Sequence, residues 1–399
     1  MSSIEALISG SGSDGVPHKN LSEIAQYIRG VTYSKADEHE SGPTVVLRSN
    51  NISIESSTLN FNDLRTVSAN VKIKPDQKLF AGDILMSAAS GSKAHVGKVA
   101  FIFEDLNYTF GGFMAVLRAD YEIRPRFLFH LLTGRMFSQY LERTLTSTTI
   151  NNLNSSIVGA FRVPVPPLEV QDAIVRVLDN FTELEAELEA ELEAELEARK
   201  KQYEFYRHQL LSTNLPSGVE FMHLGLLLGP LPRGKRLTKS ALAPSGSIPV
   251  YHGGLSPIGY HDESNTPGNT VMVINTGASS GSVGWSSTAF WCSDACFALP
   301  NSNTIAPRFL YHYASLNEQF FTSKVRRAGI PTLAPKAICD LPFPILPMSL
   351  QLEIARVLDD LSELTTNLSI SLPAELNARR KQYEYYRDKL LTFKELDAK

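Results

Sequence analysis

Hydrophobic residues recur at helical spacing in two widely separated stretches of the chain. Apolar positions follow each other at intervals of three and four residues over 174–196, and again over 354–376. This spacing predicts a long amphipathic helix in each stretch. Proline-rich segments ("VPVPPLE" and "LPFPILPMSLQ") precede both and forbid an earlier start. Roughly 44 residues at 1.5 Å each would extend about 65 Å. A single helix of that length needs a partner for its leucine stripe, which favours pairing of the two copies.

The two stretches belong to an internal repeat. Residues 164–212 align without a gap on residues 344–392, with 25 identities in 49 positions. The chain therefore consists of two tandem halves. One difference affects the helix itself: Pro373 stands where the first copy has Glu193. A proline inside a helix loses a hydrogen bond and clashes with the preceding turn, so the second helix is expected to kink, or to break and restart, near Ser371.

The blocks between the helices predict mixed α+β domains. Each contains short apolar runs broken by Gly, Pro and Asn, typical of strands and hairpins, and then a helix with a shared start, "RPRFLFHLL" or "APRFLYHYA". The predicted organisation is an N-terminal segment (1–14), a first domain (15–163), a first helix (164–212), a second domain (213–343), a second helix (344–392) and a C-terminal tail (393–399).

Composition adds a charge asymmetry to this organisation. The 399 residues carry a net charge of −4, but eight of the 42 acidic residues lie in the fourfold repeat "ELEAELEAELEAELEA" at 183–198. Without them, 38 basic residues face 34 acidic ones, so the rest of the chain is mildly basic. No apolar run is long enough for a membrane span and no signal peptide is evident, so a cytoplasmic protein is expected. Three cysteines predict free thiols and no metal site.

Motifs for catalysis are missing from the sequence. The glycine-rich "GASSGSVG" at 277–284 lacks the Lys-Ser/Thr pair of a phosphate loop. We find no zinc-binding helix, no Gly-x-Ser-x-Gly elbow, no dinucleotide fingerprint and no Asn-Pro-Pro-aromatic motif of adenine methyltransferases. These observations favour a binding protein over an enzyme.

Both helices end in a similar motif, "QYEFYR" at 202–207 and "QYEYYR" at 382–387, and begin with "EVQDAIVRVLD" and "SLQLEIARVLD". With the alternation of divergent domains and near-identical helices, the whole chain resembles the specificity (S) subunit of type I restriction-modification systems. The tetrapeptide repeat points to the IC subgroup, although the unit here is Glu-Leu-Glu-Ala where that subgroup has Thr-Ala-Glu-Leu. The resemblance implies two α+β target-recognition domains separated by two long antiparallel, coiled-coil-like spacer helices with pseudo-twofold symmetry.

The resemblance also implies partners. The chain itself would be non-catalytic and without a cofactor, and would recognise a split, asymmetric site in double-stranded DNA. Two methyltransferase (M) subunits would bind S-adenosylmethionine and methylate one adenine in each half-site, flipping it out of the duplex. Two motor-nuclease (R) subunits, using ATP and Mg, would complete the restriction enzyme and provide host defence.

Within this family the ELEA repeat would set the distance between the half-sites. One four-residue unit lengthens a helix by about 6 Å and turns it by a net 40°, close to the 34 to 36° that one base pair of B-DNA turns. We therefore predict that adding or deleting one unit changes the spacer by about one base pair. The alternative is a slippage-prone DNA repeat expressed as a solvated helix. The glutamates of the repeat should face solvent or basic protein surface.

Candidate DNA contacts are side chains that reach base edges or phosphates from loops. In the first domain they are Lys93, His95, Lys98, Arg143, Thr148, Thr149, Asn151, Asn152 and Asn154; in the second they are Arg233, Lys235, Arg236, His252, Lys324, Arg326, Arg327 and Thr332. The tract 143–154 aligns with 323–334, so both domains would use one equivalent loop.

Candidate contacts of the spacer helices, with each other or with partner subunits, lie on the leucine stripe and in the helix endings. They are Leu184, Leu188, Leu192, Leu196, Tyr203, Tyr206, Arg207, Leu364, Leu368, Leu376, Tyr383, Tyr386 and Arg387. For the four tyrosines we favour packing between the helices, and for the two arginines docking or ion pairing.

Two other functions remain open. A free-standing bivalent DNA-binding regulator would bind half-sites tightly without any methyltransferase. A coiled-coil scaffold for protein partners would show no salt-dependent DNA binding. The bases recognised and the absolute spacer length do not follow from the sequence.

Overall fold

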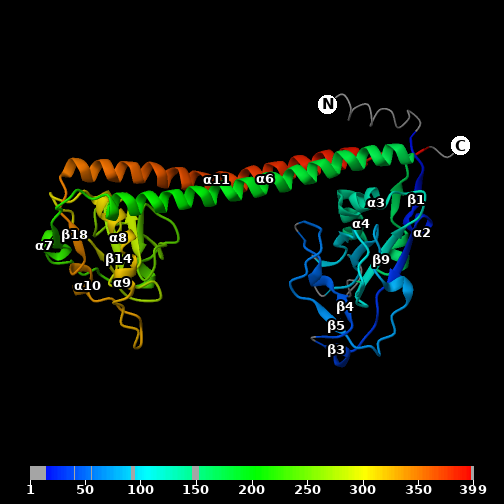
Figure 1. The fold of residues 1–399 in the computed structure, drawn as a ribbon, viewed down its shortest axis with the longest axis horizontal. Helices are drawn as coiled ribbons and strands as arrows, with labels where there is room; N and C mark the ends of the chain where they lie inside the picture. Colours follow the sequence, from blue (N-terminus) through cyan, green and yellow to red (C-terminus); the bar gives the residue numbers. More distant parts are fainter. Residues whose placement is uncertain (1–14, 40, 55, 91–94, 146–151, 397–399) are drawn as a thin grey trace. The chain divides into compact units, whose positions relative to one another are not determined.

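The computed structural model describes residues 15–39, 41–54, 56–90, 95–145 and 152–396. The chain divides into two compact units (Figure 1), unit 1 with Met1–Ala190 and Ala374–Lys399 and unit 2 with Glu191–Pro373. Both predicted long helices are present, α6 (Leu168–His208) and α11 (Met348–Leu391). Because the division cuts through both of them, each helix contributes one half to each unit.

Unit 1 contains an α+β domain between residue 15 and the start of α6. Its elements are β1 (His18–Asn20), α2 (Leu21–Ile24), β2 (Ala25–Arg29), η1 (Lys35–Asp37), β3 (Glu38–His39), β4 (Thr44–Leu47), η2 (Ser49–Asn51), β5 (Arg65–Val67), η3 (Pro75–Gln77), β6 (Ile84–Ser87), β7 (Val99–Phe101), β8 (Tyr108–Phe110), β9 (Met114–Ala119), α3 (Pro125–Thr133), α4 (Arg135–Leu145), α5 (Ser155–Gly159) and β10 (Arg162–Pro164).

Unit 2 contains a second α+β domain between α6 and α11. A π-helical turn, η5 (Gln209–Thr213), ends α6. The elements that follow are β11 (Phe221–His223), α7 (Leu224–Leu228), η6 (Lys239–Ala241), β12 (Ile248–Tyr251), β13 (Gly259–His261), β14 (Thr270–Ile274), β15 (Val283–Ser286), β16 (Trp291–Cys292), β17 (Cys296–Ala298), α8 (Pro307–Leu316), α9 (Glu318–Thr322), α10 (Pro335–Cys339) and β18 (Pro342–Pro344).

The two domains share one strand topology. In unit 1, β6 lies between β7 and β9, with antiparallel pairing on both sides, and β14 lies in the same way between β15 and β17 in unit 2. A parallel pair recurs as β4 with β8 and as β12 with β16. The entry strand also pairs with the strand before the long helix in both units, β1 with β10 and β11 with β18. The predicted correspondence of the two domains is confirmed, and unit 1 adds β2 and β3 at sheet edges.

Each domain completes its core with residues from both long helices. Ile174 and Leu178, near the start of α6, are buried in the core of unit 1 together with Leu391 at the end of α11. The equivalent core of unit 2 contains Ile354 and Leu358 near the start of α11, and Leu211 just after α6. These residues occupy matching positions of the repeat, so the sequence similarity reflects one packing arrangement used twice.

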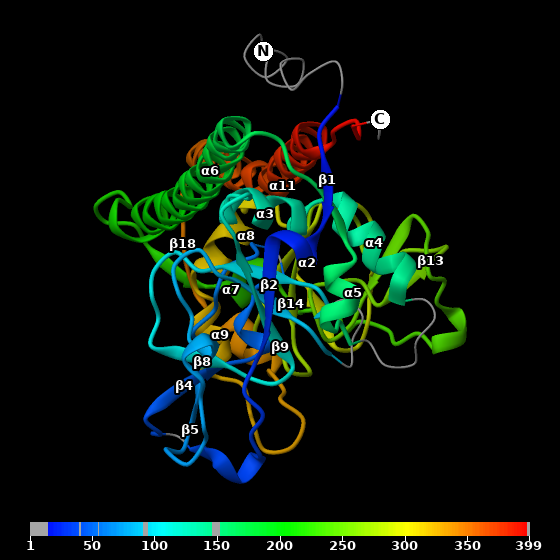
Figure 2. The ribbon, with the colours of Figure 1, turned by 90° about the vertical axis from the view of Figure 1, so that its right-hand side faces the viewer.

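The last residues of the chain close unit 1. Val16 donates its backbone N–H to Lys394 O (2.9 Å), and Leu396 donates to Val16 O (2.9 Å). Figure 2 shows β1 beside this C-terminal segment. Arg162, on β10, forms an ion pair with Glu395 (2.5 Å). The first domain therefore depends on chain from the opposite end of the sequence.

Within unit 1 the two helices run antiparallel. The ring of Phe181 on α6 stacks on Tyr386 of α11 with the ring centroids 5.9 Å apart. Further along α6, Glu185 and Glu189 pair with Arg380 at 3.0 and 3.6 Å, earlier in α11. The predicted pairing of the copies is thus confirmed here, and so is the expectation that repeat glutamates meet basic protein surface.

The predicted break in the second helix is wrong. α11 continues without interruption from Met348 to Leu391, with Pro373 inside it. Pro373 is exposed, whereas its neighbours Leu372 and Leu376 are half-buried. The proline ring therefore faces solvent, and packing of the two half-buried leucines on an adjacent face offsets the lost hydrogen bond.

The uninterrupted helix implies that Pro373 carries an avoidable cost. Pro373→Ala should raise the free energy of unfolding by up to about 3 kcal/mol, because Ala restores the missing backbone donor. Glu193→Pro, at the matching position of α6, should lower it by a similar amount, with Glu193→Ala as the neutral control. Chemical denaturation of the full chain measures both changes. Equal stability of Pro373→Ala and the unmodified chain would contradict this prediction.

Candidate functional site

Each domain is fixed to the start of a long helix by a buried glutamine. Gln171 Oε1 accepts from the backbone N–H of Arg124 (2.7 Å), the residue that caps α3, and its amide nitrogen donates to Pro166 O (2.8 Å) and Glu122 O (3.1 Å). Gln351 does the same for α8 in unit 2. It accepts from Ala306 N (2.9 Å) and donates to Leu346 O and Thr304 O, both at 2.9 Å. These bonds satisfy backbone groups that a helix start leaves unpaired.

About two turns further along the long helix, an aspartate binds a histidine and an arginine of the domain. In unit 1, Asp179 Oδ1 lies 2.8 Å from both His130 Nε2 and Arg126 Nε. Asp359 repeats this in unit 2, at 2.7 Å from His312 Nε2 and 2.9 Å from Arg308 Nε.

Two aromatic rings contact the arginine in each unit. The guanidinium of Arg126 lies over Phe101 and Phe129, 4.9 and 4.6 Å from the ring centroids. Arg308 lies 4.7 Å from both Trp285 and Tyr311. A lysine would lack the planar guanidinium that lies on the rings while several of its N–H groups reach the carboxylate.

The end of the other long helix completes each arrangement. Arg387 of α11 lies over the Tyr383 ring in unit 1 (5.4 Å), and Arg207 of α6 lies over Tyr203 in unit 2 (5.3 Å). We call the two sets of six the first junction (Arg126, His130, Gln171, Asp179, Tyr383, Arg387) and the second junction (Arg207, Tyr203, Arg308, His312, Gln351, Asp359).

Burial disfavours the charged form of both junction histidines. Burial lowers the pKa of His130, and it lowers the pKa of His312 to about 4, against the opposing effect of the aspartates. Burial alone would raise the pKa of Asp359, but the hydrogen bonds from Arg308 and His312 hold it below its usual range. A neutral imidazole that donates from Nε2 to a carboxylate has an acceptor at Nδ1. In the second junction this Nδ1 faces the Tyr203 hydroxyl at 3.3 Å, whereas His130 Nδ1 is buried with no partner among the described residues.

The sequence contains a signal for the junctions in both halves of the repeat. The shared "RFLFH" and "RFLYH" place Arg and His one helical turn apart, and the aspartate and glutamine are identical in the aligned helices. Their roles depend on a contact between segments about 50 positions apart, which periodicity within a helix does not reveal.

Several helix residues have roles other than those predicted. Tyr386 packs between the helices, as predicted, with its ring on Phe181. Tyr203 and Tyr383 pack against the domain cores, to which the other long helix also contributes residues. Tyr206 is exposed, with its ring edge against Phe205. Leu184 and Leu364 are also exposed, by 61% and 53%. Half-buried members of the stripe are Leu188, Leu192, Leu196, Leu368 and Leu376.

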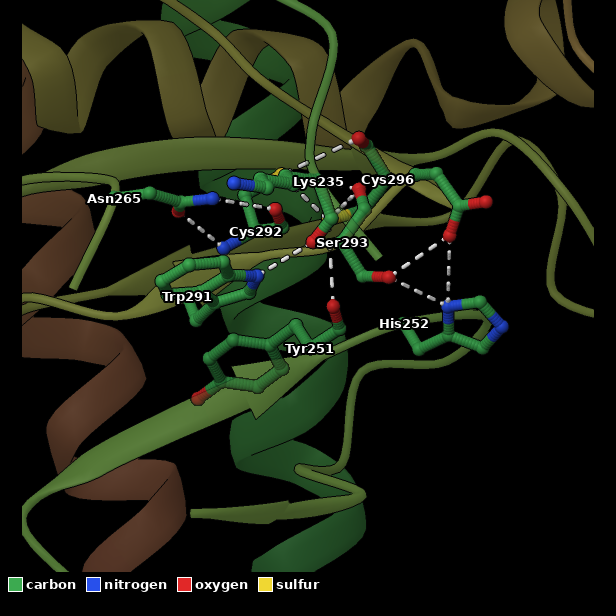
Figure 3. A network of polar contacts seen from close by, with 9 residues as sticks. Lys235, Tyr251, His252, Asn265, Trp291, Cys292, Ser293 and Cys296 are labelled. Atoms are coloured by element: carbon green, nitrogen blue, oxygen red, sulfur yellow. Dashed lines mark hydrogen bonds and ion pairs between the residues drawn. The ribbon is translucent and has the colours of Figure 1, made fainter. Parts of the chain in front are cut away.

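In unit 2, the predicted DNA contacts of residues 233–236 are held against the turn after β16. Lys235 donates its backbone N–H to Cys292 O (3.1 Å), and its own carbonyl accepts from Trp291 Nε1 (2.6 Å), as Figure 3 shows. A Cβ at Gly234 would lie 1.9 Å from Ser293 O, so only glycine permits this approach. The side chains of Arg233, Lys235 and Arg236 are exposed.

His252 contacts the same turn after β16 from the other side. Its Nδ1 lies 2.9 Å from Ser293 Oγ and 3.6 Å from Asp294 Oδ1. In Figure 3 the second ring nitrogen points away from the residues drawn. Beneath this turn, Cys292 and Cys296 are buried free thiols with their sulfurs 2.7 Å apart, as the composition predicted, and Cys339 is half-buried. Their hydrogen bond and burial raise the pKa of Cys292.

The remaining candidates of unit 2 lie on a hairpin beside His252. Arg326 and Thr332 exchange two backbone hydrogen bonds, of 2.9 and 3.1 Å. Thr332 also forms an isolated β-bridge with Thr276. Thr276 in turn lies close to Gly253, the neighbour of His252, because a Cβ placed on Gly253 would be 3.0 Å from the Thr276 carbonyl oxygen. The exposed cations here are Lys324, Arg326 and Arg327. We call residues 233–236, 252–253, 276–277 and 324–332 together the basic edge of unit 2.

Unit 1 anchors the equivalent loop in the same way. Leu153 donates its backbone N–H to Ala88 O at 2.7 Å, and Leu333 donates to Asn275 O at 2.7 Å. Asn152 bridges to Ala89 as Thr332 does to Thr276. The structure thus gives both loops one attachment, as the alignment predicted. Four candidates fall outside the described residues: Lys93, Thr148, Thr149 and Asn151.

Other candidates of unit 1 make contacts within the domain. The Lys98 ammonium donates to Ile52 O (2.7 Å), and burial lowers its pKa. The Asn154 side chain accepts from Ile157 N (2.9 Å) and caps α5. His95 is half-buried and Arg143 is exposed. Sequence reasoning selected these residues by type and could not detect such internal partners.

Two general features concern the described part of the chain. No group of three or more His, Cys, Asp or Glu side chains gathers there as metal ligands would. None of the helices described has the length and apolar character needed to cross a membrane.

The buried junction histidines predict acid sensitivity. His312 has a pKa of about 4 in the fold and about 6.5 when unfolded. Between these values the unfolded chain binds a proton that the folded chain does not, so stability is complete above pH 6.5 and falls as the pH drops towards 4. The charged or titratable groups around His312 are Asp359, Arg308, Arg207, Tyr203 and Tyr311. Asp359 affects the pH dependence of stability only at lower pH, because its pKa is lowered below the usual range of a carboxyl group.

Thermal unfolding between pH 7.5 and 5 tests this. His312→Gln should start from a lower melting temperature and lose less on acidification than the unmodified chain. His223→Gln, at an exposed histidine of the same unit, is the control and should keep the original pH dependence. An unchanged slope in His312→Gln would exclude His312 as its source.

The chain is similar to known proteins over both halves. The family model described as "Type I restriction modification DNA specificity domain" matches residues 14–198 and 216–378. A putative type I restriction enzyme specificity subunit of Haemophilus influenzae is 30% identical over 336 residues, which cover 75% of this chain and 84% of the relative. The Escherichia coli type I restriction enzyme EcoR124I/EcoR124II specificity subunit is 27% identical over 268 residues, 58% of this chain and 63% of the relative.

Solved structures show the same fold. The HsdS subunit from Thermoanaerobacter tengcongensis superposes with a TM-score of 0.63 at 17% identity, covering 95% of this chain and 97% of that one. A chain from a study of the assembly and conformational transition of a type I R-M system gives a TM-score of 0.71 at 17% identity, covering 94% and 97%. These likenesses confirm the predicted α+β fold with two recognition domains. The protein belongs to the family of type I restriction-modification DNA specificity subunits.

Proposed function

We propose that this chain is the non-catalytic subunit that recognises a bipartite, asymmetric DNA sequence for a type I methyltransferase and restriction enzyme. The observation that carries the proposal is the pair of domains with one topology, one junction and one loop attachment but different side chains at the loops. Two modules of one scaffold with different surfaces are suited to two different half-sites.

The basic edge of unit 2 has the properties of a DNA-binding surface. Its exposed cations lie on backbone that is held in place by hydrogen bonds, so little conformational freedom is lost on binding. Arginines can bind guanine bidentately and phosphates electrostatically. The acid in contact with this edge is Asp294, which pairs with His252.

The two loops support recognition of different bases. Arg326 and Arg327 align with Thr146 and Ser147 in the first half. A change from guanidinium to hydroxyl groups alters both charge and reach, and therefore the base pairs that can be bound. The half-sites would differ accordingly.

The long helices offer two equivalent surfaces for partner subunits. Phe205 and Tyr385 occupy matching positions of the repeat and are exposed by 58% and 62%. Leu184 and Leu364 form a second matching pair and are also exposed. Large apolar side chains that stay exposed at both copies suit two molecules of one partner. We assign them to two M subunits, which would supply S-adenosylmethionine and the chemistry. Two R subunits, with ATP and Mg, would join this complex.

The test is co-expression of the full chain with the methyltransferase encoded beside it, followed by mapping of methylated adenines. A complex of one chain with two M subunits that marks one split motif supports the proposal. Half-site binding by the chain alone would favour a free-standing regulator. A complex without salt-dependent DNA binding would favour a protein scaffold.

Arginines of the basic edge should contribute to the salt dependence of binding by the methyltransferase complex. Arg326→Ala combined with Arg327→Ala should weaken binding and lower the slope of log affinity against log salt by about 0.9 for each phosphate contact removed. Lys336→Ala, an exposed cation on α10 outside the edge, is the control. Affinity and slope that match the control would remove these arginines from the DNA interface.

The ELEA repeat should set the spacer. Deleting one unit from α6 should shorten the non-specific spacer of the mapped motif by about one base pair and leave both half-sites unchanged, because the recognition domains are not altered. Replacing one unit by four alanines keeps the helix length and should leave the spacer as it was. An unchanged spacer after deletion would contradict this prediction.

A further inference from the structure

The hairpin of the basic edge, residues 326–332, presents an apolar side chain at its tip. Ile330 is 70% exposed, and Ala328 and Gly329 before it are exposed as well. Gly329 has φ +83° and no atom within 4 Å of a Cβ placed on it, so the tip stands clear of the rest of the described domain.

The hairpin is firmly attached below this tip. Besides the two Arg326–Thr332 bonds, Pro331 O accepts from Gly277 N (3.0 Å) and from Ser280 Oγ (3.0 Å). The Thr332 hydroxyl donates to Ile330 O at 2.9 Å. The backbone next to Ile330 is therefore held on both sides, and Pro331 further restricts it. A side chain on such a support can be pushed into a partner without the loop folding away.

The surroundings of the tip favour DNA as the partner. The segment 323–334 contains Lys324, Arg326 and Arg327 and no acidic residue. Lys324 lies over the Phe320 ring, with Nζ 3.7 Å from its centroid. A segment with three exposed cations and one exposed aliphatic side chain matches a phosphate backbone that flanks a base stack. Proteins that bend or open DNA insert Ile, Leu, Phe or Met between base steps in this way.

The repeat indicates that this side chain acts independently of sequence. Ile330 aligns with Ile150, in "TINNL" and "GIPTL", while the residues around it differ between the halves. Both loops keep the same 2.7 Å attachment, Leu153 to Ala88 and Leu333 to Asn275. Residue 150 lies outside the described residues. An isoleucine that is present in both halves, while the residues around it differ, suits a step that is common to both half-sites.

We propose that Ile330 is a wedge that enters the duplex beside the target adenine, separates one base step, and so lowers the cost of turning the adenine out of the helix. The proposal rests on the proposed function, since it requires DNA binding in a methyltransferase complex. It adds a role that is distinct from sequence recognition. Extrusion of a base costs least where the base is already unpaired.

The lower cost of turning out an unpaired base gives a direct test of the wedge. The complex of the full chain with its methyltransferase is bound to a duplex carrying the mapped motif, and to the same duplex with an abasic site opposite the target adenine of the second half-site. Ile330→Ala should weaken binding to the paired duplex at least tenfold, and much less on the opened duplex. Ile330→Leu should stay close to the unmodified chain, because it preserves the apolar volume. 2-Aminopurine at the target position should lose its fluorescence increase with Ile330→Ala and retain it with Ile330→Leu.

Arg326→Ala is the matched control, since a phosphate or base contact should be lost equally on both duplexes. Equal losses for Ile330→Ala on the two duplexes would overturn the wedge and assign Ile330 to an ordinary groove contact. Unchanged binding and fluorescence would show an idle surface residue, and loss of the methyltransferase from the complex would show a protein contact. If the unmodified complex selects no split motif, the proposed function fails. If the unmodified complex selects a split motif and Ile330→Ala binds both duplexes as the unmodified complex does, only the wedge proposal fails.

Discussion

The contact between an aspartate of a long helix and the Arg–His pair of a domain helix is the constraint on which the rest of this structure depends. Asp179 and Asp359 are half-buried, and each binds a fully buried histidine and an arginine that lies against aromatic rings. Removing the aspartate would leave the buried imidazole without its partner, which costs more than the loss of a surface ion pair. Because Gln171 and Gln351 fix the start of the same domain helices, position and rotation are both specified.

The junctions also explain why each long helix has to be long. α6 begins under the first domain, where it supplies Gln171 and Asp179, and ends under the second, where it supplies Tyr203 and Arg207. α11 has the complementary roles. The stretch of α6 between these ends, which contains the ELEA repeat, belongs to neither junction. A change in the number of repeat units would therefore leave the residues of both junctions in place, as the proposed spacer role requires.

Much of this arrangement could be predicted from the internal repeat. The helices begin where the prolines permit, and the aligned segments bury equivalent residues such as Leu178 and Leu358. The break at Pro373 was wrong because helix propensity was considered without the packing of Leu372 and Leu376. That Tyr203 and Tyr383 also pack against the domain cores could not be predicted, because a motif at a helix end does not reveal which elements lie opposite. Lys98 and Asn154 show the same limit for the DNA contacts: residue type indicates what a side chain can bind, whereas its internal partners depend on the fold.

The most direct test of the account exchanges one domain for the other. A chain in which residues 218–343 replace residues 15–163 keeps Gln171 and Asp179, which should accept the second domain's Arg308 and His312 in the first junction. Mapping methylated adenines after co-expression with the methyltransferase measures what this chain recognises. The account predicts a motif made of two copies of the second half-site. A motif that keeps the original first half-site would contradict it, because recognition would then not reside in the exchanged domain.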